Sequence, residues 1–161
     1  MRNLSSNMID SKQLREHVIQ PVLKDMGMHS QAAENLLVMI AAHESMMGTY
    51  LKQIKGPALG IYQMEPVTAI DIMDNFIKKR PDLHERVQGY MTGMGGGRKH
   101  DLVGNLMFQT ALARVFFLRF KEPLPDADDL KGLAAYAKKY WNTYLGKATA
   151  EDYLKAYKPH H

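Results

Sequence analysis

The sequence contains no cysteine, so no disulfide can form and the fold must be stabilised by packing alone. It also lacks any uninterrupted apolar stretch of about 18 residues, the length that a membrane-spanning helix needs, and we therefore expect no membrane insertion. Residues 1–12 carry no apolar run of the kind found in signal peptides. These absences predict a protein without an export signal of its own.

What is present is the composition of an ordinary globular protein, with 45% hydrophobic and 24% charged residues. Its 161 residues suffice for one substantial core, and we expect residues 1–161 to form a single domain. The formal net charge of +4 favours an anionic partner. However, the basic residues are scattered, and the helix dipole accounts for the short run Lys78-Lys79-Arg80 at the end of a predicted helix. We therefore expect no nucleic acid partner.

Apolar residues recur at helical spacing through most of the chain, and the predicted fold class is mainly α. Pro21 must break or kink the first helical segment, which is marked by Leu14, Val18 and Val22. Further helices are predicted over residues 30–45, 66–79, 83–91, 102–120 (capped by Asp101) and 129–142, and from Thr149 onward. Residues 46–65 suit a loop or small hairpin, and the glycine-rich residues 92–100 suit a mobile loop.

One acidic residue, Glu44, falls on the apolar face of the helix predicted over residues 30–45. It follows Ile40 by four residues and lies in the last turn, where unsatisfied carbonyls carry a partial negative charge. Burial and the helix end both favour the protonated carboxyl, which is the form that a general acid needs. An isolated glutamate would more often rotate out to solvent.

His43, beside Glu44, gives the His-Glu order of a zinc-protease helix. No second histidine stands four residues before or after His43, so the metal-ligand spacing is missing. We therefore expect neither a metal nor another cofactor.

A set of residues at fixed spacing surrounds Glu44. These are Glu44-Ser45, followed by Gly60, Gln63, Pro66, Thr68 and Ala69. The set resembles the pattern of the lytic transglycosylase family (soluble lytic transglycosylases and goose-lysozyme-like proteins), most of all its phage-encoded members. Two later stretches are similar to further motifs of the family, Asn105-Leu106 to an Asn-Ile helix start and Ala134-Ala135-Tyr136 to Ala-Tyr-Asn-Ala-Gly. The chain then departs from the family, because Ala137, Lys138 and Lys139 stand where the family has Asn-Ala-Gly.

The resemblance implies a lysozyme-like, helix-dominated α+β fold in which residues 46–65 border a cleft. It implies cleavage of the β-1,4 bond between N-acetylmuramic acid and N-acetylglucosamine in peptidoglycan, with 1,6-anhydromuramic products. Glu44 would be the single catalytic acid and then base. Substrate-binding roles would fall to Ser45 as an orienting hydroxyl or C-terminal cap, Gly60 as a point of close backbone approach, Tyr62 in the groove, Gln63 on the sugar's N-acetyl group or nearby backbone, and Tyr136 with its hydroxyl close to Glu44.

Two alternatives stay open at this stage. Glu65 lies within the motif and is either a base for water, as in a goose-type muramidase, or a helix N-terminal anion. The departure after Tyr136 favours a non-catalytic wall-binding or virion structural protein of the same fold. In each case the expected partners are peptidoglycan glycan strands, perhaps joined by other virion proteins. The expected location is the phage virion, or the host cytoplasm before release, and the target is the bacterial cell wall.

Overall fold

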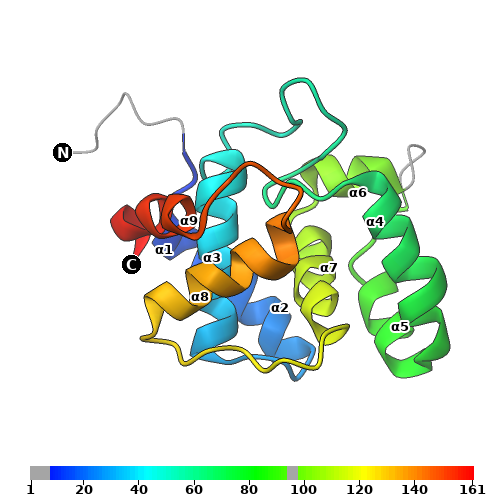
Figure 1. Ribbon diagram of the computed structural model, residues 1–161. Coiled ribbons are helices and arrows are strands. Elements are labelled where there is room, and N and C mark those ends of the chain that lie inside the picture. Colours follow the sequence, from blue (N-terminus) through cyan, green and yellow to red (C-terminus); the bar gives the residue numbers. More distant parts are fainter. Residues whose placement is uncertain (1–7, 94–97) are drawn as a thin grey trace.

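The computed structural model describes residues 8–93 and 98–161, and it is built of helices joined by loops (Figure 1). Among these residues the β-structure is limited to two isolated bridges, Lys52↔Leu59 and Leu59↔Met64. The fold is therefore mainly α, as the sequence predicts. In chain order the elements are α1 Ser11–Leu14, η1 Arg15–Ile19, α2 Gln20–Asp25, α3 Gln31–Ser45, α4 Pro66–Asp71, η2 Ile72–Phe76, η3 Ile77–Lys79, α5 Pro81–Gln88, α6 Arg98–Gly104, α7 Leu106–Leu118, α8 Leu130–Tyr136, η4 Ala137–Asn142, α9 Ala150–Tyr157 and η5 Lys158–His160.

Helix α3 is the buried centre of the molecule. Every residue from 33 to 42 is buried, because η1, α7, α8 and α9 pack around this helix (Figure 1). Its start matches the prediction, since the Ser30 hydroxyl accepts a hydrogen bond from the Ala33 backbone N–H at 3.1 Å. Its end places Glu44 in the last turn, and Met46 follows in the left-handed region with φ 50°.

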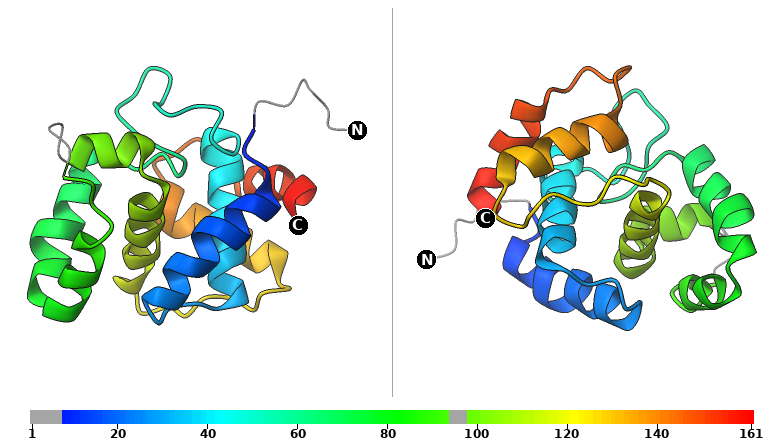
Figure 2. Two further views of the ribbon diagram at one scale, coloured as in Figure 1. Left: turned by 180° about the vertical axis from the view of Figure 1, so that it is seen from behind. Right: turned by 60° about the horizontal axis from the view of Figure 1, so that its bottom comes forward.

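Helix α7 separates the part around α3 from a second layer formed by α4, η2, η3 and α5 (Figures 1 and 2). The prediction of one helix over residues 102–120 is wrong. The chain leaves the helical conformation at Asn105, whose φ of −96° and ψ of 93° divide α6 from α7. The Asn105 side chain caps α7 by accepting from the Phe108 N–H at 3.0 Å, whereas Asp101, the predicted cap, lies inside α6.

Prolines set several boundaries. Pro21 lies in the first turn of α2, directly after the π-helical turn η1, because a residue without an N–H cannot continue the regular hydrogen-bond ladder. Pro66 and Pro81 stand at the first positions of α4 and α5, where the missing N–H costs nothing. The last helix, α9, begins after Thr149, which forms a capping box with Asp152.

Residues 46–65 form a loop that passes over the end of α3, as predicted, and joins the two layers (Figure 1). Met47 and Ile61 anchor it in the core with no exposed surface. The mobile loop predicted over residues 92–100 falls largely on residues 94–97, which lie outside the described part of the chain. No helix in the described part is both long and apolar enough to cross a membrane.

Candidate active site

Glu44 faces a pocket of about 460 Å³ at the end of α3. The pocket lies where the loop 46–65, the start of α4 and the segment after η4 come together (Figure 1). Besides Glu44, it is lined by Gln53, Ala58, Gln63, Met64, Glu65, Thr68, Phe116, Trp141, Asn142, Thr143 and Gly146. The lining combines carboxylates, amides and hydroxyls with an aromatic wall, which suits a polar ligand that also has flat apolar faces.

The Glu44 side chain is partly buried, with 19% of its surface exposed. The Tyr153 hydroxyl, from α9, donates a hydrogen bond to Oε1 of this carboxyl group. His43 Nδ1 lies 3.5 Å from the same oxygen, and the His43 ring packs on Tyr153 with centroids 4.1 Å apart. One carboxyl oxygen is thus held by protein, and the side chain still reaches the pocket.

Burial raises the pKa of Tyr153, and the adjacent Glu44 carboxylate and its hydrogen bond raise this pKa further. The phenol therefore stays neutral through the physiological range and remains a hydrogen-bond donor. A donor on the carboxylate stabilises its ionised form and fixes the direction in which the carboxyl group points. We infer that Tyr153 orients Glu44.

Replacing Tyr153 with phenylalanine should slow any reaction that Glu44 performs by about 10- to 100-fold, the cost of one hydrogen bond to a charged group. The same change should flatten the stability profile at alkaline pH. A raised folded pKa means that the native state keeps a proton that the unfolded chain loses near pH 10, so wild-type stability falls as pH climbs above about 10. Thermal unfolding between neutral and strongly alkaline pH measures this difference.

Tyr157→Phe is the matched control, because Tyr157 is equally buried on α9 but its hydroxyl accepts from Arg15 at 2.8 Å instead of contacting Glu44. The control should lose stability and keep the reaction rate. Equal rates for Tyr153→Phe and Tyr157→Phe would contradict the orienting role.

Glu65, the second carboxylate of the sequence motif, lines the same pocket. It is exposed at the N-cap position of α4, but its side chain makes no capping hydrogen bond. Its carboxylate is therefore not engaged as a cap and remains available to the pocket.

Gln63 also lines the pocket, as predicted, with a left-handed φ of 53°. Its Nε2 donates to the Gly60 carbonyl at 2.8 Å and more weakly to the Tyr50 carbonyl at 3.5 Å. Both hydrogen bonds use the amide nitrogen, so Oε1 is the atom left to accept from a ligand.

Two of the predicted binding residues are engaged elsewhere. Ser45 is fully buried, and its hydroxyl donates to the Ala41 carbonyl at 3.1 Å and accepts from the Gly48 N–H at 2.8 Å. It is a C-terminal cap, the second of the two roles considered for it. Tyr62 was expected in the groove, but it is 1% exposed and its hydroxyl pairs with Thr110 in the core at 2.8 Å, so that prediction is wrong.

The predicted positions of Gly60 and Tyr136 also need correction. Gly60 makes its close approach to protein, since a Cβ there would lie 2.1 Å from the Leu102 carbonyl oxygen and 2.2 Å from Gln109 Oε1. The Tyr136 hydroxyl donates to the Glu122 carbonyl at 3.0 Å. The hydroxyl on Glu44 comes from Tyr153 instead, because α9 packs against the end of α3 and brings that side chain onto the carboxyl group.

No protein-family model, curated protein or solved structure matches this chain. The assignment of the site therefore depends on its geometry and on the sequence pattern.

Sequence reasoning missed Tyr153 and the segment Trp141 to Gly146. The signal for Tyr153 was weak, because its contact with Glu44 joins residues 109 positions apart. It also missed Glu34, the most buried acid on α3, at 1% exposed. Gln20 and Gln31 donate to the Glu34 carboxylate at 2.5 and 2.6 Å, and Arg15 lies 3.6 Å away, so this acid is satisfied within the protein.

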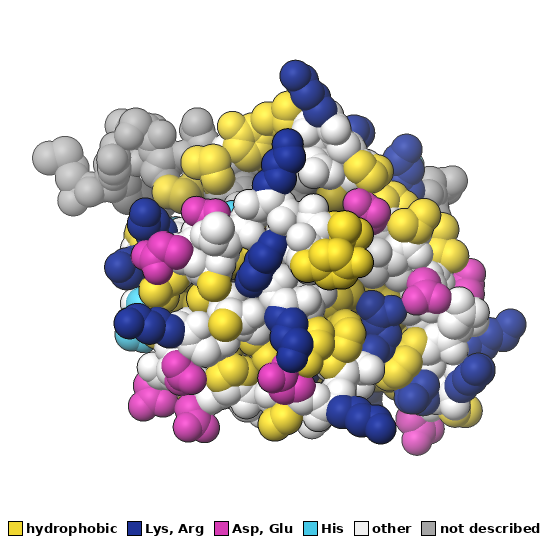
Figure 3. Space-filling model, viewed as in Figure 1, with side chains coloured by type: hydrophobic (Ala, Val, Ile, Leu, Met, Phe, Trp, Pro, Cys, Tyr) yellow, Lys and Arg dark blue, Asp and Glu magenta, His cyan; other side chains and the backbone are white. Residues whose placement is uncertain are grey.

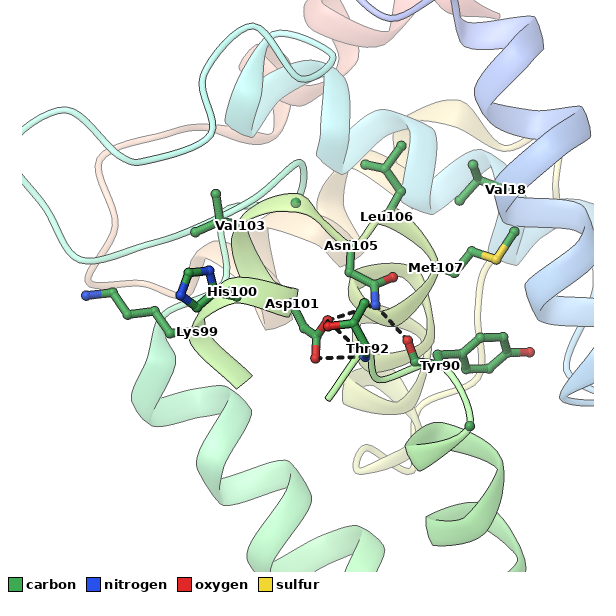
Figure 4. A pocket seen from close by; sticks show the side chains of 12 residues that line it. Val18, Tyr90, Thr92, Lys99, His100, Asp101, Val103, Asn105, Leu106 and Met107 are labelled. Atoms are coloured by element: carbon green, nitrogen blue, oxygen red, sulfur yellow. Dashed lines mark hydrogen bonds between the residues drawn. The ribbon is translucent and has the colours of Figure 1, made fainter. Parts of the chain in front are cut away.

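A larger pocket of about 1090 Å³ lies between η1, the end of α5, α6 and the start of α7 (Figure 4). Its buried carboxylate, Asp101, accepts from the Thr92 hydroxyl at 2.8 Å and from Asn105 Nδ2 at 2.9 Å, and Asn105 also donates to the Tyr90 carbonyl at 2.6 Å. These polar groups clasp the chain after α5 to the α6–α7 junction. They are directed at one another, while Lys99 points away from them (Figure 4). The chemically equipped pocket is therefore the smaller one, at Glu44.

The charged surface gives no competing site. On the face drawn in Figure 3, Lys and Arg side chains are spread among acidic and hydrophobic ones instead of forming one patch. Within residues 8–93 and 98–161, no group of three or more His, Asp or Glu side chains is arranged to hold a metal ion.

Proposed function

We propose that this protein is a peptidoglycan lytic transglycosylase with Glu44 as its acid and base. The observation that carries the proposal is the setting of Glu44: a half-buried carboxyl group at the end of α3, oriented by a buried tyrosine, at the wall of a polar pocket. The resemblance of the sequence around Glu44 and Gln63 to lytic transglycosylases supplies the reaction class. Gln63 at the pocket wall is consistent with a contact to the sugar's N-acetyl group.

In the proposed reaction, Glu44 in its protonated form donates its proton to the glycosidic oxygen as the bond to the anomeric carbon breaks. The N-acetyl group of the muramic acid residue stabilises the anomeric carbon, so no protein nucleophile is needed. The Glu44 carboxylate then takes the proton from the C6 hydroxyl, whose oxygen forms the new bond to that carbon. Glu44 is thereby returned to its protonated form, and the product is a 1,6-anhydro sugar.

Tyr153 supports both halves of this cycle. As a neutral donor on Oε1 it stabilises the carboxylate that forms when Glu44 loses its proton. It leaves Oε2 as the oxygen for proton transfer in the pocket. Trp141 and Phe116 line the opposite wall, where flat sugar faces would pack.

The position of Glu65 supports a second candidate, a muramidase that hydrolyses the same bond. Two carboxyl groups at one pocket are the usual equipment of glycosidases, one as acid and the other as base for water. Mass spectrometry of muropeptides released from purified sacculi tests the proposal. Anhydro products are expected, reducing-end products would assign the hydrolase, and the absence of any product would leave a non-catalytic wall-binding protein.

Replacing Glu65 with glutamine separates the two enzymes. In a transglycosylase the change should cost less than about 10-fold in rate, because the C6 hydroxyl replaces water and Glu44 is the base. In a hydrolase it should cost about 100-fold or more, the usual contribution of a general base. The rate of muropeptide release measures this, with Glu85→Gln as the control, since Glu85 is an exposed acid on α5 that does not line the pocket at Glu44.

A further inference from the structure

Lys138 makes an unusual set of contacts at the end of η4. Its Nζ donates hydrogen bonds to Asn142 Oδ1 at 2.6 Å, to the Thr143 carbonyl at 2.7 Å and to the Gly146 carbonyl at 3.0 Å. All three acceptors are uncharged, and Lys138 forms no ion pair within the described residues. One half-buried ammonium group therefore gathers the whole segment 142–146 around itself.

The gathered segment forms a wall of the Glu44 pocket, since Asn142, Thr143 and Gly146 all line it. Thr143 has φ 67° and ψ 170°, a region that residues other than glycine rarely occupy. A β-branched residue stays in such a conformation only when its surroundings hold it there. The bond from Lys138 to the Thr143 carbonyl is the contact that holds it.

Asn142 connects this wall to the site. Its side chain makes a hydrogen bond to Tyr153, and the Tyr153 hydroxyl donates to Glu44. Because Lys138 occupies Oδ1 of Asn142, the amide nitrogen is the end that is free to donate to the tyrosine oxygen. The order of donors is then Lys138, Asn142, Tyr153 and Glu44, and each hydrogen bond polarises the next in the same direction.

We propose that Lys138 is a positioning residue for Glu44, which acts by holding the segment 142–146 and by fixing the direction of the Asn142 amide. The name of the reaction that Glu44 performs rests on the proposed function; the contacts from Lys138 to Glu44 do not. A lysine here also gives a use to the position at which the sequence departs from the transglycosylase motif. The competing interpretation is that Lys138 only caps a helix end, in which case its loss lowers stability and leaves Tyr153 and Glu44 as they were.

The test compares Lys138→Met with Lys139→Met. Lys139 is the adjacent, exposed lysine, which pairs with Glu122 at 3.2 Å and not with the pocket. The first measurement needs no activity: proton NMR of the Tyr153 hydroxyl, assigned by its absence from Tyr153→Phe. The resonance should move upfield or broaden in Lys138→Met and stay in place in Lys139→Met. Lys138→Gln, which keeps a donor, should give a smaller change of the same sign if Lys138→Met does not fold.

The second measurement is a double-mutant cycle on the rate of muropeptide release. Lys138→Met alone should slow the reaction by about 10-fold or more, but it should add little to Tyr153→Phe, because both changes act through the same hydroxyl. An unmoved hydroxyl resonance in a folded Lys138→Met or Lys138→Gln protein would overturn the inference, as would full additivity in the cycle. If the wild-type protein releases no muropeptides, the proposed function fails, and the resonance alone decides the role of Lys138.

Discussion

Replacing Glu44 with glutamine is expected to slow muropeptide release by about 100- to 10,000-fold, the contribution of a general acid and base. The amide keeps the size of the side chain and can still accept a hydrogen bond from Tyr153, but it has no proton to give to the glycosidic oxygen. The fold should be retained, because the Glu44 side chain is not part of the core cluster. Circular dichroism and thermal unfolding check the fold, and mass spectrometry of digested sacculi gives the rate.

Glu34→Gln is the matched control for this experiment. It removes a carboxylate from the same helix, but Glu34 is held by Gln20, Gln31 and Arg15 and does not line the Glu44 pocket. This variant should lose stability and keep close to the wild-type rate per folded molecule. A folded Glu44→Gln protein that kept more than about a tenth of the wild-type rate would remove Glu44 from the catalytic role.

The largest expected effect on stability comes from Gly60→Ala. Gly60 has φ 81°, and an added Cβ would lie 2.1 Å from the Leu102 carbonyl oxygen and 2.2 Å from Gln109 Oε1. Gln109 is itself fixed, because Oε1 accepts from the Ile61 N–H at 2.7 Å and Nε2 donates to the Asp101 carbonyl at 3.1 Å. The strained backbone and the clash together should lower the free energy of unfolding by about 2 to 5 kcal/mol.

Gly27→Ala separates backbone strain from steric clash. Gly27 has a similar φ of 68°, but an added Cβ meets nothing within 4 Å. This change should cost only the left-handed conformation, about 1 to 2 kcal/mol. Chemical denaturation of both variants gives the comparison, and equal losses at the two positions would mean that the packing of Gly60 against α6 and α7 contributes nothing.

The sequence predicted those parts of the fold that depend on local chemistry. Ser30 and Pro66 start helices because a capping hydroxyl and a missing N–H act within one turn of the chain. The break at Asn105 was not predicted, because the apolar residues of α6 and α7 continue in one helical pattern across it. A single asparagine can sit inside a helix or cap one, and only the clasp with Tyr90 and Asp101 decides between the two.

The candidate site was predicted only where the motif and the chain are close together. Glu44 and Gln63 reach the same pocket because a short loop carries one toward the other. The aromatic residues were harder to place, since Tyr62, Tyr136 and Tyr153 are all buried and each has a polar partner. Which tyrosine meets Glu44 depends on how α9 packs on α3, and periodicity along the chain does not contain that information.

Trp141 gives the pocket wall a property that the rest of the molecule lacks. It is the single tryptophan of the chain, and it lies between the pocket and the rings of Phe116 and Phe117, at centroid distances of 4.8 and 5.8 Å. All tryptophan fluorescence of the protein therefore originates at this wall. A saccharide that enters the pocket would displace water from the indole and shift its emission, so binding can be followed in unlabelled protein, including the Glu44→Gln variant that cannot turn the ligand over.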